Sequence, residues 1–282
     1  MKSSSTNKGL NFWEHFDELR RYLLRILVVW VVFATVAFVF KEQVFAVLLA
    51  PKSPDFFIYA GFAHIQSFIA QYWSFDEVLE PMLETQLINT ELASQFIIHI
   101  KASFAVGVVF ASPYILFLLF RFISPALYAH ERKIGAVFCC VSYILFLLGV
   151  LLSYFIIFPF TFRFLSSYYV SSEVVNLISL QSYMQSLFTI SLLMGIMFEI
   201  PVLCWILAKL RLLKAEFMKH YRRHAIVAIV IVAAIITPTG DAFTLTIVSL
   251  PLCLLYELSI WVVQRVEKKQ KISTQVSNLH QY

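Results

Sequence analysis

The lysines and arginines of this 282-residue chain are distributed unevenly around its long apolar runs. Eighteen of the 22 lie close to one set of run ends, and only Lys41, Lys52, Lys101 and Arg163 lie close to the other. Basic residues accumulate in the cytoplasmic loops of membrane proteins, so this asymmetry predicts a multi-span protein with a defined orientation. With 60% hydrophobic and 14% charged residues, the composition excludes a soluble globular domain.

Six apolar stretches are expected to cross the membrane. They cover residues 23–40, 102–120, 134–158, 183–208, 225–236 and 243–263. Lipid offers no partner for a bare backbone N–H or C=O group, so each stretch must be helical. An even number of crossings places both termini on one side, which the basic residues assign to the cytoplasm. The sequence therefore predicts an all-α integral membrane protein with six transmembrane helices and an N-in/C-in topology.

The fifth stretch is short. Residues 225–236 would form a helix of about 18 Å, whereas the hydrocarbon core is about 30 Å thick. Either the helix extends toward His224, or the bilayer thins around a short hairpin of the fifth and sixth helices.

We expect one membrane domain over residues 1–282. Within it, residues 1–22 are expected to form a cytoplasmic interfacial helix, residues 41–101 an expanded external loop, and residues 264–282 a cytoplasmic tail. Acidic residues from Asp76 to Glu91 interleave with apolar residues as far as Leu87. This spacing predicts one or two amphipathic helices over the outer face. A packed cap with a solvated acidic side is favoured over a ligand site.

No cofactor, metal or nucleic acid is expected. The four cysteines lie within apolar stretches and form no CxxC pair, so we interpret them as small buried apolar residues. They are Cys139, Cys140, Cys204 and Cys253. The net charge of +5 follows from the basic cytoplasmic loops.

Three acidic residues lie at membrane depth. A carboxyl group inside a span is costly unless it is paired, hydrated or protonated, so a functional role is favoured for Glu199. Asp241 lies in the sequence TPTGD, where an aspartate also suits a tight turn. Glu257 is nearer the cytoplasmic end and could instead reach the lipid headgroups.

Two further acidic residues lie on separate cytoplasmic segments. Glu18 precedes the first span and could be neutralised by Arg21, three residues later on the same helix. Glu131 lies in the next cytoplasmic loop beside Arg132 and Lys133, where a solvated surface charge is the simpler interpretation.

Seven motifs occur in order along the chain. They are HFDELR at 15–20, AP at 50–51, FISPALYAHERK at 122–133, YFIIFP at 154–159, FEIPV at 198–202, TP at 237–238 with Asp241, and LP at 250–251 with YE at 256–257. On a six-span chain with a cytoplasmic N-terminus, this set resembles the TatC family, the receptor subunit of the twin-arginine protein translocase, over nearly the whole length.

The resemblance implies six tilted helices in a concave, glove-like bundle in the bacterial inner membrane. It implies a receptor, not an enzyme, that binds twin-arginine signal peptides and exports folded proteins with the proton-motive force. The implied partners are single-span subunits of the TatA/TatB type and further copies of the chain itself. The implied signal-peptide site is Glu18, Arg20, Phe122, Leu127 and Glu131; Glu199 matches the intramembrane partner position, and Pro51, Tyr154, Asp241 and Glu257 are further motif positions.

The chemistry of the implied site suits its ligand. Adjacent arginines in an extended peptide project to opposite sides, so acidic residues from two segments are needed to hold both. A carboxylate accepts a guanidinium bidentately, whereas lysine offers only a point charge, so Glu18 and Glu131 would favour arginine.

The chain departs from the family pattern in several places. Tyr22 replaces the usual second arginine of the first motif, and Arg21 lies one position earlier. An insertion covers roughly residues 54–90, His99 stands where the family has proline, Gly240 adds a residue to the turn, and Leu245 replaces a glutamine.

Two other function classes compete with the translocase hypothesis. A proton- or cation-coupled transporter would use Glu199, Asp241 and Glu257 along one path, and would be expected to show repeat symmetry or paired broken helices. A passive membrane scaffold would have no substrate.

Overall fold

The computed structural model describes residues 12–54, 56, 58–59, 86–123, 135–168, 171, 177–237 and 240–279. Almost all of them are helical. The helices are α1 (Phe12–Val39), α2 (Lys41–Leu49), η1 (Ala50–Lys52), α4 (Ser94–Ile123), α5 (Gly135–Leu152), the π-helix η4 (Ser153–Ile157), α6 (Phe158–Ser167), α7 (Leu180–Met197), α8 (Ile200–Lys209), α9 (Ala215–His220), α10 (Arg222–Ile236) and α11 (Ala242–Leu279).

The predicted all-α membrane class is confirmed. Among the described residues, five helical segments are long and apolar enough to cross a membrane, beginning at Phe16, Ser94, Phe138, Leu180 and Ala242. The remaining expected span, the fifth, corresponds to α10, which has 15 residues and a length of about 22 Å. It begins at Arg222 and therefore includes His224. This agrees with the first of the two interpretations of the short stretch, in which the helix extends toward His224.

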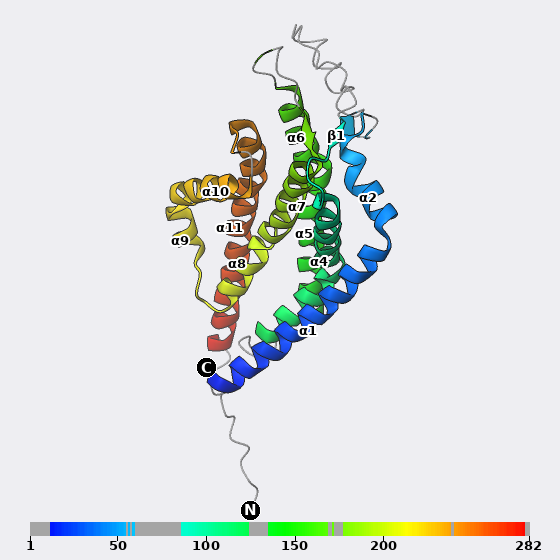
Figure 1. Cartoon of the computed structure of the whole chain (residues 1–282). Helices are drawn as coiled ribbons and strands as arrows, with labels where there is room; N and C mark the ends of the chain where they lie inside the picture. Colours follow the sequence, from blue (N-terminus) through cyan, green and yellow to red (C-terminus); the bar gives the residue numbers. More distant parts are fainter. Residues whose placement is uncertain are drawn as a thin grey trace, which may run out of the picture.

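The path of the chain brings the start of α1 and the end of α11 to the same end of the molecule (Figure 1). α8 ends near that end and α11 begins at the opposite one, so the segment containing α9 and α10 carries the chain back between them. In the same view α10 lies across the upper part of α11, and α1 and α2 follow a curved path along one edge.

Small residues allow two pairs of helices to approach closely. A Cβ atom at Gly107 of α4 would lie 2.8 Å from the backbone nitrogen of Ala34 in α1. A Cβ atom at Gly149 of α5 would lie 2.6 Å from the carbonyl oxygen of Met194 and 2.9 Å from the Cα of Gly195, both in α7. Contacts between apolar helices in lipid depend on such close packing, because burial from water contributes little there.

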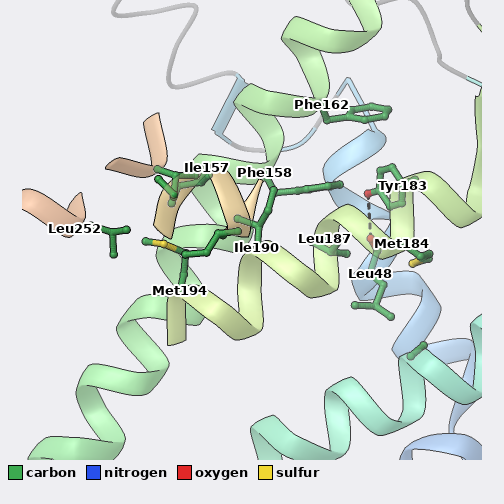
Figure 2. Packing of buried hydrophobic residues seen from close by; sticks show 14 of the residues in the cluster. Leu48, Ile157, Phe158, Phe162, Tyr183, Met184, Leu187, Ile190, Met194 and Leu252 are labelled. Atoms are coloured by element: carbon green, nitrogen blue, oxygen red, sulfur yellow. Dashed lines mark hydrogen bonds between the residues drawn. The ribbon is translucent and has the colours of Figure 1, made fainter. Parts of the chain in front are cut away.

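A cluster of apolar side chains joins the half of the bundle farther from the start of α1 (Figure 1, Figure 2). Phe158 and Phe162 pack against the ring of Tyr183 with near-perpendicular planes. Met194 and Leu252 extend the cluster towards α11. This cluster holds together parts of the third, fourth and sixth expected spans.

The fourth span consists of two helices. Pro201 has no N–H group, so it cannot donate to the carbonyl of Met197, and its ring disfavours a continuous helix. α7 ends at Met197, Phe198 and Glu199 form a turn, and α8 begins at Ile200. The sequence indicated this weak point through Pro201, and the turn places Glu199 at the junction.

The prediction for the external loop is wrong at Leu87. Leu87 and Ile88 form strand β1 (Leu87–Ile88), which pairs in parallel with β2 (Ile178–Ser179). A backbone outside the hydrocarbon core can form hydrogen bonds with another segment. Here the pairing of β1 with β2 takes the place of the predicted helix at Leu87. The preceding acidic stretch, 76–85, lies outside the described residues.

Two helix boundaries also differ from the prediction. α4 begins at Ser94, eight residues before the predicted 102, and α11 continues through the predicted tail to Leu279. Glu267 of α11 accepts a hydrogen bond from the backbone N–H of Ala215 at 3.0 Å, and Gln270 donates to the carbonyl of Lys209 at 3.2 Å. The α11 extension therefore caps both ends of the connection from α8 to α9.

Candidate functional site

The N-terminal half of the candidate signal-peptide site lies on α1. Tyr22 follows Glu18 by one helical turn, and its hydroxyl donates a hydrogen bond to Glu18 Oε1 at 3.1 Å. The Tyr22 side chain is buried, and its ring meets Phe122 edge to face at a centroid distance of 6.1 Å. Glu18 on α1 is therefore connected through Tyr22 to the last turn of α4.

The basic residues of the first motif point elsewhere. The Nε of Arg21 donates to the carbonyl of Asp17 at 3.4 Å, a long contact within the same helix. Arg20 is exposed. A peptide that approaches this end of α1 can therefore reach the Arg20 side chain directly.

The other half of the predicted site lies outside the described residues. Glu131 and Leu127 belong to residues 124–134, between the end of α4 at Ile123 and the start of α5 at Gly135. Of the five predicted site residues, the structure places Glu18, Arg20 and Phe122. Sequence reasoning treated Tyr22 only as a departure from the family; its spacing of four from Glu18 was the available signal for the hydrogen bond.

Glu199 lies at the junction of α7 and α8 and faces α5. Ser142 donates its hydroxyl proton to Glu199 Oε2 at 2.5 Å. The other oxygen, Oε1, is buried and has no hydrogen-bond partner among the described residues. A polar group in this state can form a further hydrogen bond with an incoming polar side chain.

An apolar groove lies between α5, which carries Ser142, and α8, which follows Glu199 in the chain. It has a volume of about 370 Å³ and is formed by α5, α8 and α11. Val141 precedes Ser142 in sequence, and Pro201 follows Glu199 by two positions, but neither Ser142 nor Glu199 is among the residues that line the groove. Its lining is Phe138, Val141, Leu145, Pro201, Val202, Trp205, Leu258 and Val262.

The remaining two acidic residues have local partners. Asp241 Oδ1 accepts a hydrogen bond from the backbone N–H of Thr244 at 2.7 Å, so Asp241 is the N-cap of α11. Glu257 on α11 forms an ion pair with Arg222 at the start of α10, and both side chains remain partly exposed. The structure thus places Asp241 in a capping turn. Glu257, which was considered as a residue that could reach the lipid headgroups, is instead paired with Arg222 of the protein.

The motif residues Pro51 and Tyr154 belong to a group of tyrosine contacts around the end of α2, which we call the tyrosine clamp. Tyr154 donates to the carbonyl of Val47 at 2.6 Å, and Tyr183 donates to that of Leu48 at 3.1 Å (Figure 2). Tyr59 lies 2.9 Å from the carbonyl of Pro51 and 3.2 Å from that of Pro159.

Tyr154 and Tyr183 of the tyrosine clamp supply donors to carbonyl groups in the last turn of α2, where the regular helical partners run out, and the carbonyl of Val47 also accepts from the backbone N–H of Ala50. Burial raises the pKa of Tyr59 above its ordinary value, although the nearby Arg163 lowers it, so the phenol keeps the proton that it donates. Sequence reasoning singled out Pro51 and Tyr154 but missed Tyr59 and Tyr183, because a lone aromatic residue gives no sign of a distant carbonyl partner.

The described part of the chain contains no group of three or more His, Cys, Asp or Glu side chains that could hold a metal ion. All four cysteines are free thiols.

Comparison with known proteins agrees with this arrangement. The family described as Sec-independent protein translocase protein (TatC) matches residues 14–251. The chain is 34% identical over 261 residues to the Sec-independent protein translocase protein TatC of Blattabacterium sp. subsp. Periplaneta americana (strain BPLAN), an alignment that covers 92% of this chain and 97% of the relative. It is 30% identical to the corresponding protein of Aquifex aeolicus (strain VF5), over 92% of this chain and 96% of the relative.

The fold is similar to solved structures as well. A crystal structure of the twin arginine translocase receptor TatC superposes with a TM-score of 0.71 at 30% identity, covering 90% of this chain and 100% of that one. A second, obtained in DDM, gives a TM-score of 0.70 at 31% identity and covers 88% of this chain and 99% of the other.

Proposed function

Because the chain belongs to the TatC family of Sec-independent protein translocase proteins, we propose that it binds the twin-arginine signal peptides of folded precursor proteins through Glu18 and Glu131. The protein is a translocase component and not an enzyme. It exports its precursors across the bacterial inner membrane with the proton-motive force.

The observation that carries this proposal is the connection from Glu18 through Tyr22 to Phe122. Phe122 lies in the last turn of α4, and the segment that follows it contains Glu131. This contact places the end of α4, from which the Glu131-bearing segment starts, beside the part of α1 that carries Glu18. Two carboxylates on separate segments suit two adjacent arginines, which point to opposite sides of an extended peptide.

The orientation in the membrane follows from the charges. The start of α1 and the end of α11 lie at the same end of the molecule, where the N-terminal arginines and the basic α11 extension are also found. Under the positive-inside rule this end faces the cytoplasm, with six crossings between the two termini. A signal peptide therefore meets Glu18 on the side where precursors are made.

Glu199 serves a different part of the function. Its buried Oε1, together with an apolar groove formed by α5, α8 and α11, suits a single-span helix that carries one polar side chain, of the TatA/TatB type. An unpaired charge at this depth is costly, so Glu199 hydrogen-bonds such a partner in its neutral form. Glu199 then contributes to assembly and transport, and Glu18 and Glu131 contribute to signal recognition.

The test of signal recognition is site-specific crosslinking of a twin-arginine signal peptide to the full chain in membranes. Glu18→Ala and Glu131→Ala should each weaken binding roughly ten-fold or more, because hydrogen bonds to charged groups contribute about 1.5 to 3 kcal/mol. Reversal of either charge to lysine should weaken it further. Glu42→Ala, which removes an exposed carboxylate from the first turn of α2, is the matched control and should bind normally. Normal binding in both single alanine variants would overturn the proposal.

A further inference from the structure

A pocket lies between the connection from α8 to α9 and the α11 extension, and we call it the basic pocket. It has a volume of about 560 Å³, and its lining includes Arg211, Lys214 and Lys271. All three side chains are exposed, and none of them forms a hydrogen bond or an ion pair within the described part of the chain. The pocket therefore presents three cations that are available to an anionic ligand.

Two carboxylates also line the basic pocket. Glu267 accepts a hydrogen bond from the backbone N–H of Ala215 at 3.0 Å, so one of its oxygens is used by the pocket wall. Glu216 is exposed in the first turn of α9. Because the cations outnumber these two carboxylates, the lining carries a net positive charge.

Arg211 has a backbone conformation that does not suit its residue type. Its φ is +60°, in the left-handed region. Its N–H donates to the carbonyl of Ala208 at 3.0 Å, and the N–H of Leu212 donates to that of Leu207 at 2.9 Å. These two bonds form a Schellman motif at the end of α8, in which glycine is the usual left-handed residue. An arginine costs conformational energy at this position, so a role for its side chain is expected.

The basic pocket lies at the level where the helices leave the membrane. Lys209 is the last residue of the candidate span that contains α8, and Arg211 follows it by two positions. The Lys209 ammonium lies 5.6 Å from the ring centroid of Trp205, and the Arg265 guanidinium lies 3.6 Å from that of Trp261 on α11. Tryptophan is enriched at membrane–water interfaces, which is also the level of the lipid phosphates.

The walls of the basic pocket are held in place by other contacts. The hydroxyl of Tyr256 on α11 donates to the carbonyl of Met218 in α9 at 2.8 Å. Ala208, Ala215 and Val263 are buried in one apolar cluster that joins α8, α9 and α11. Since the pocket is formed before a ligand arrives, binding there requires little ordering of the backbone.

We propose that the basic pocket binds the phosphate headgroup of an anionic phospholipid, with Arg211 as the main ligand and Lys214 and Lys271 as supporting charges. A guanidinium can donate two parallel hydrogen bonds to phosphate oxygens, whereas each lysine acts as a point charge. Basic pockets between membrane helices bind anionic headgroups in this way. In the orientation proposed above, the lipid belongs to the cytoplasmic leaflet, and its acyl chains remain in the bilayer.

The test is a titration of the detergent-purified full chain with phosphatidylglycerol that carries a fluorescent acyl chain, followed by anisotropy. Binding should weaken as the salt concentration rises, because salt screens the attraction between exposed charges. Unlabelled phosphatidylglycerol should displace the probe, and phosphatidylcholine, which has no net charge, should displace it at least ten-fold less well. Equal displacement by phosphatidylcholine would overturn the proposal. Equal displacement by inorganic phosphate would show that the pocket takes the free anion and that the lipid assignment is wrong.

Arg211→Gly separates the side chain from the backbone. Glycine suits the left-handed conformation, so the thermal unfolding midpoint should be unchanged or higher. Affinity for the lipid probe should nevertheless fall about ten-fold or more, because hydrogen bonds between charged groups are lost. Normal binding by Arg211→Gly would overturn the proposal, since Arg211 would then have no part in the site.

A second pair of variants distinguishes the pocket from general surface charge. Lys271→Ala should bind the lipid probe about five-fold more weakly, as expected for one lysine near an anionic headgroup. Lys268→Ala removes an exposed cation of α11 that does not line the pocket, and it should bind within two-fold of the original chain. Equal losses in the two variants would mean that the lipid is attracted by the surface as a whole, and the proposed site would be wrong.

Discussion

Ser142 on α5 donates a hydrogen bond of 2.5 Å to Oε2 of Glu199 at the α7–α8 junction, and the other carboxyl oxygen has no hydrogen-bond partner among the described residues. The two residues are 57 positions apart in sequence. A buried polar atom in this state is unusual in a folded protein and calls for an explanation. The explanation that we propose is a partner helix that supplies a second hydrogen bond.

The first prediction follows from this half-satisfied group. Glu199→Gln keeps an acceptor for Ser142 and has an amide donor in place of the O–H of the neutral carboxyl group, so it should retain much of the export activity. Glu199→Ala removes every hydrogen bond of this side chain and should impair assembly with single-span partners or export of a folded reporter. Binding of the signal peptide should be unchanged in both variants. Export by Glu199→Ala at the normal rate would mean that the carboxyl group has no part in transport.

A second prediction concerns the close contact of α5 with α7. Gly149→Leu must displace the backbone of Met194 and Gly195, and overpacking of this kind costs about 1 to 3 kcal/mol of stability. Cys140→Leu adds a side chain of the same size at an exposed position of the same helix and should be nearly neutral. Thermal unfolding of the two purified variants makes the comparison. Equal midpoints would show that this crossing is looser than described.

The tyrosine clamp gives a third prediction. Tyr183→Phe leaves the ring in the apolar cluster but removes the donor to the carbonyl of Leu48, so it should destabilise the protein by about 1 to 2 kcal/mol. Tyr168→Phe, at an exposed position just after α6, should change stability little. The measurement is the unfolding midpoint together with protease sensitivity between α2 and α4. The prediction fails if both variants behave alike.

The fourth prediction tests the cap of α11. Asp241→Ala removes the acceptor for the N–H of Thr244 and should cost about 0.5 to 2 kcal/mol, whereas Asp241→Ser retains a capping oxygen and should recover most of that loss. Stability in detergent distinguishes these variants. If Asp241→Ser is as poor as Asp241→Ala, the carboxylate has a role beyond capping.

Several features of the fold could be predicted from local sequence. The apolar stretches became helices because lipid permits little else, and Pro201 marked the break in the fourth span. The TPTGD turn indicated a capping role for Asp241, which the contact with Thr244 confirms. The helix predicted through Leu87 was wrong, because water outside the membrane removes the constraint that made the other predictions safe.

Only part of each candidate site could be predicted from the sequence. Glu199 could be selected as an acidic residue at membrane depth, where a charge is costly, whereas Glu18 was selected through the resemblance to the TatC family. Their partners, Tyr22 with Phe122 and Ser142, could not be selected, since tyrosine and serine are common and carry no such cost.

The sequence by itself determined that this protein crosses the membrane as helices, which ends of those helices carry the positive charge, and which acidic residues needed an explanation. These properties depend on the transfer of short segments between water and lipid, so the residues of each segment are enough to determine whether that segment crosses the membrane. Only the tertiary structure decided that Tyr22 joins Glu18 to α4, that Ser142 occupies one oxygen of Glu199, and that Gly149 admits α7. Those contacts depend on how distant helices pack against one another, and packing is a property of the whole bundle.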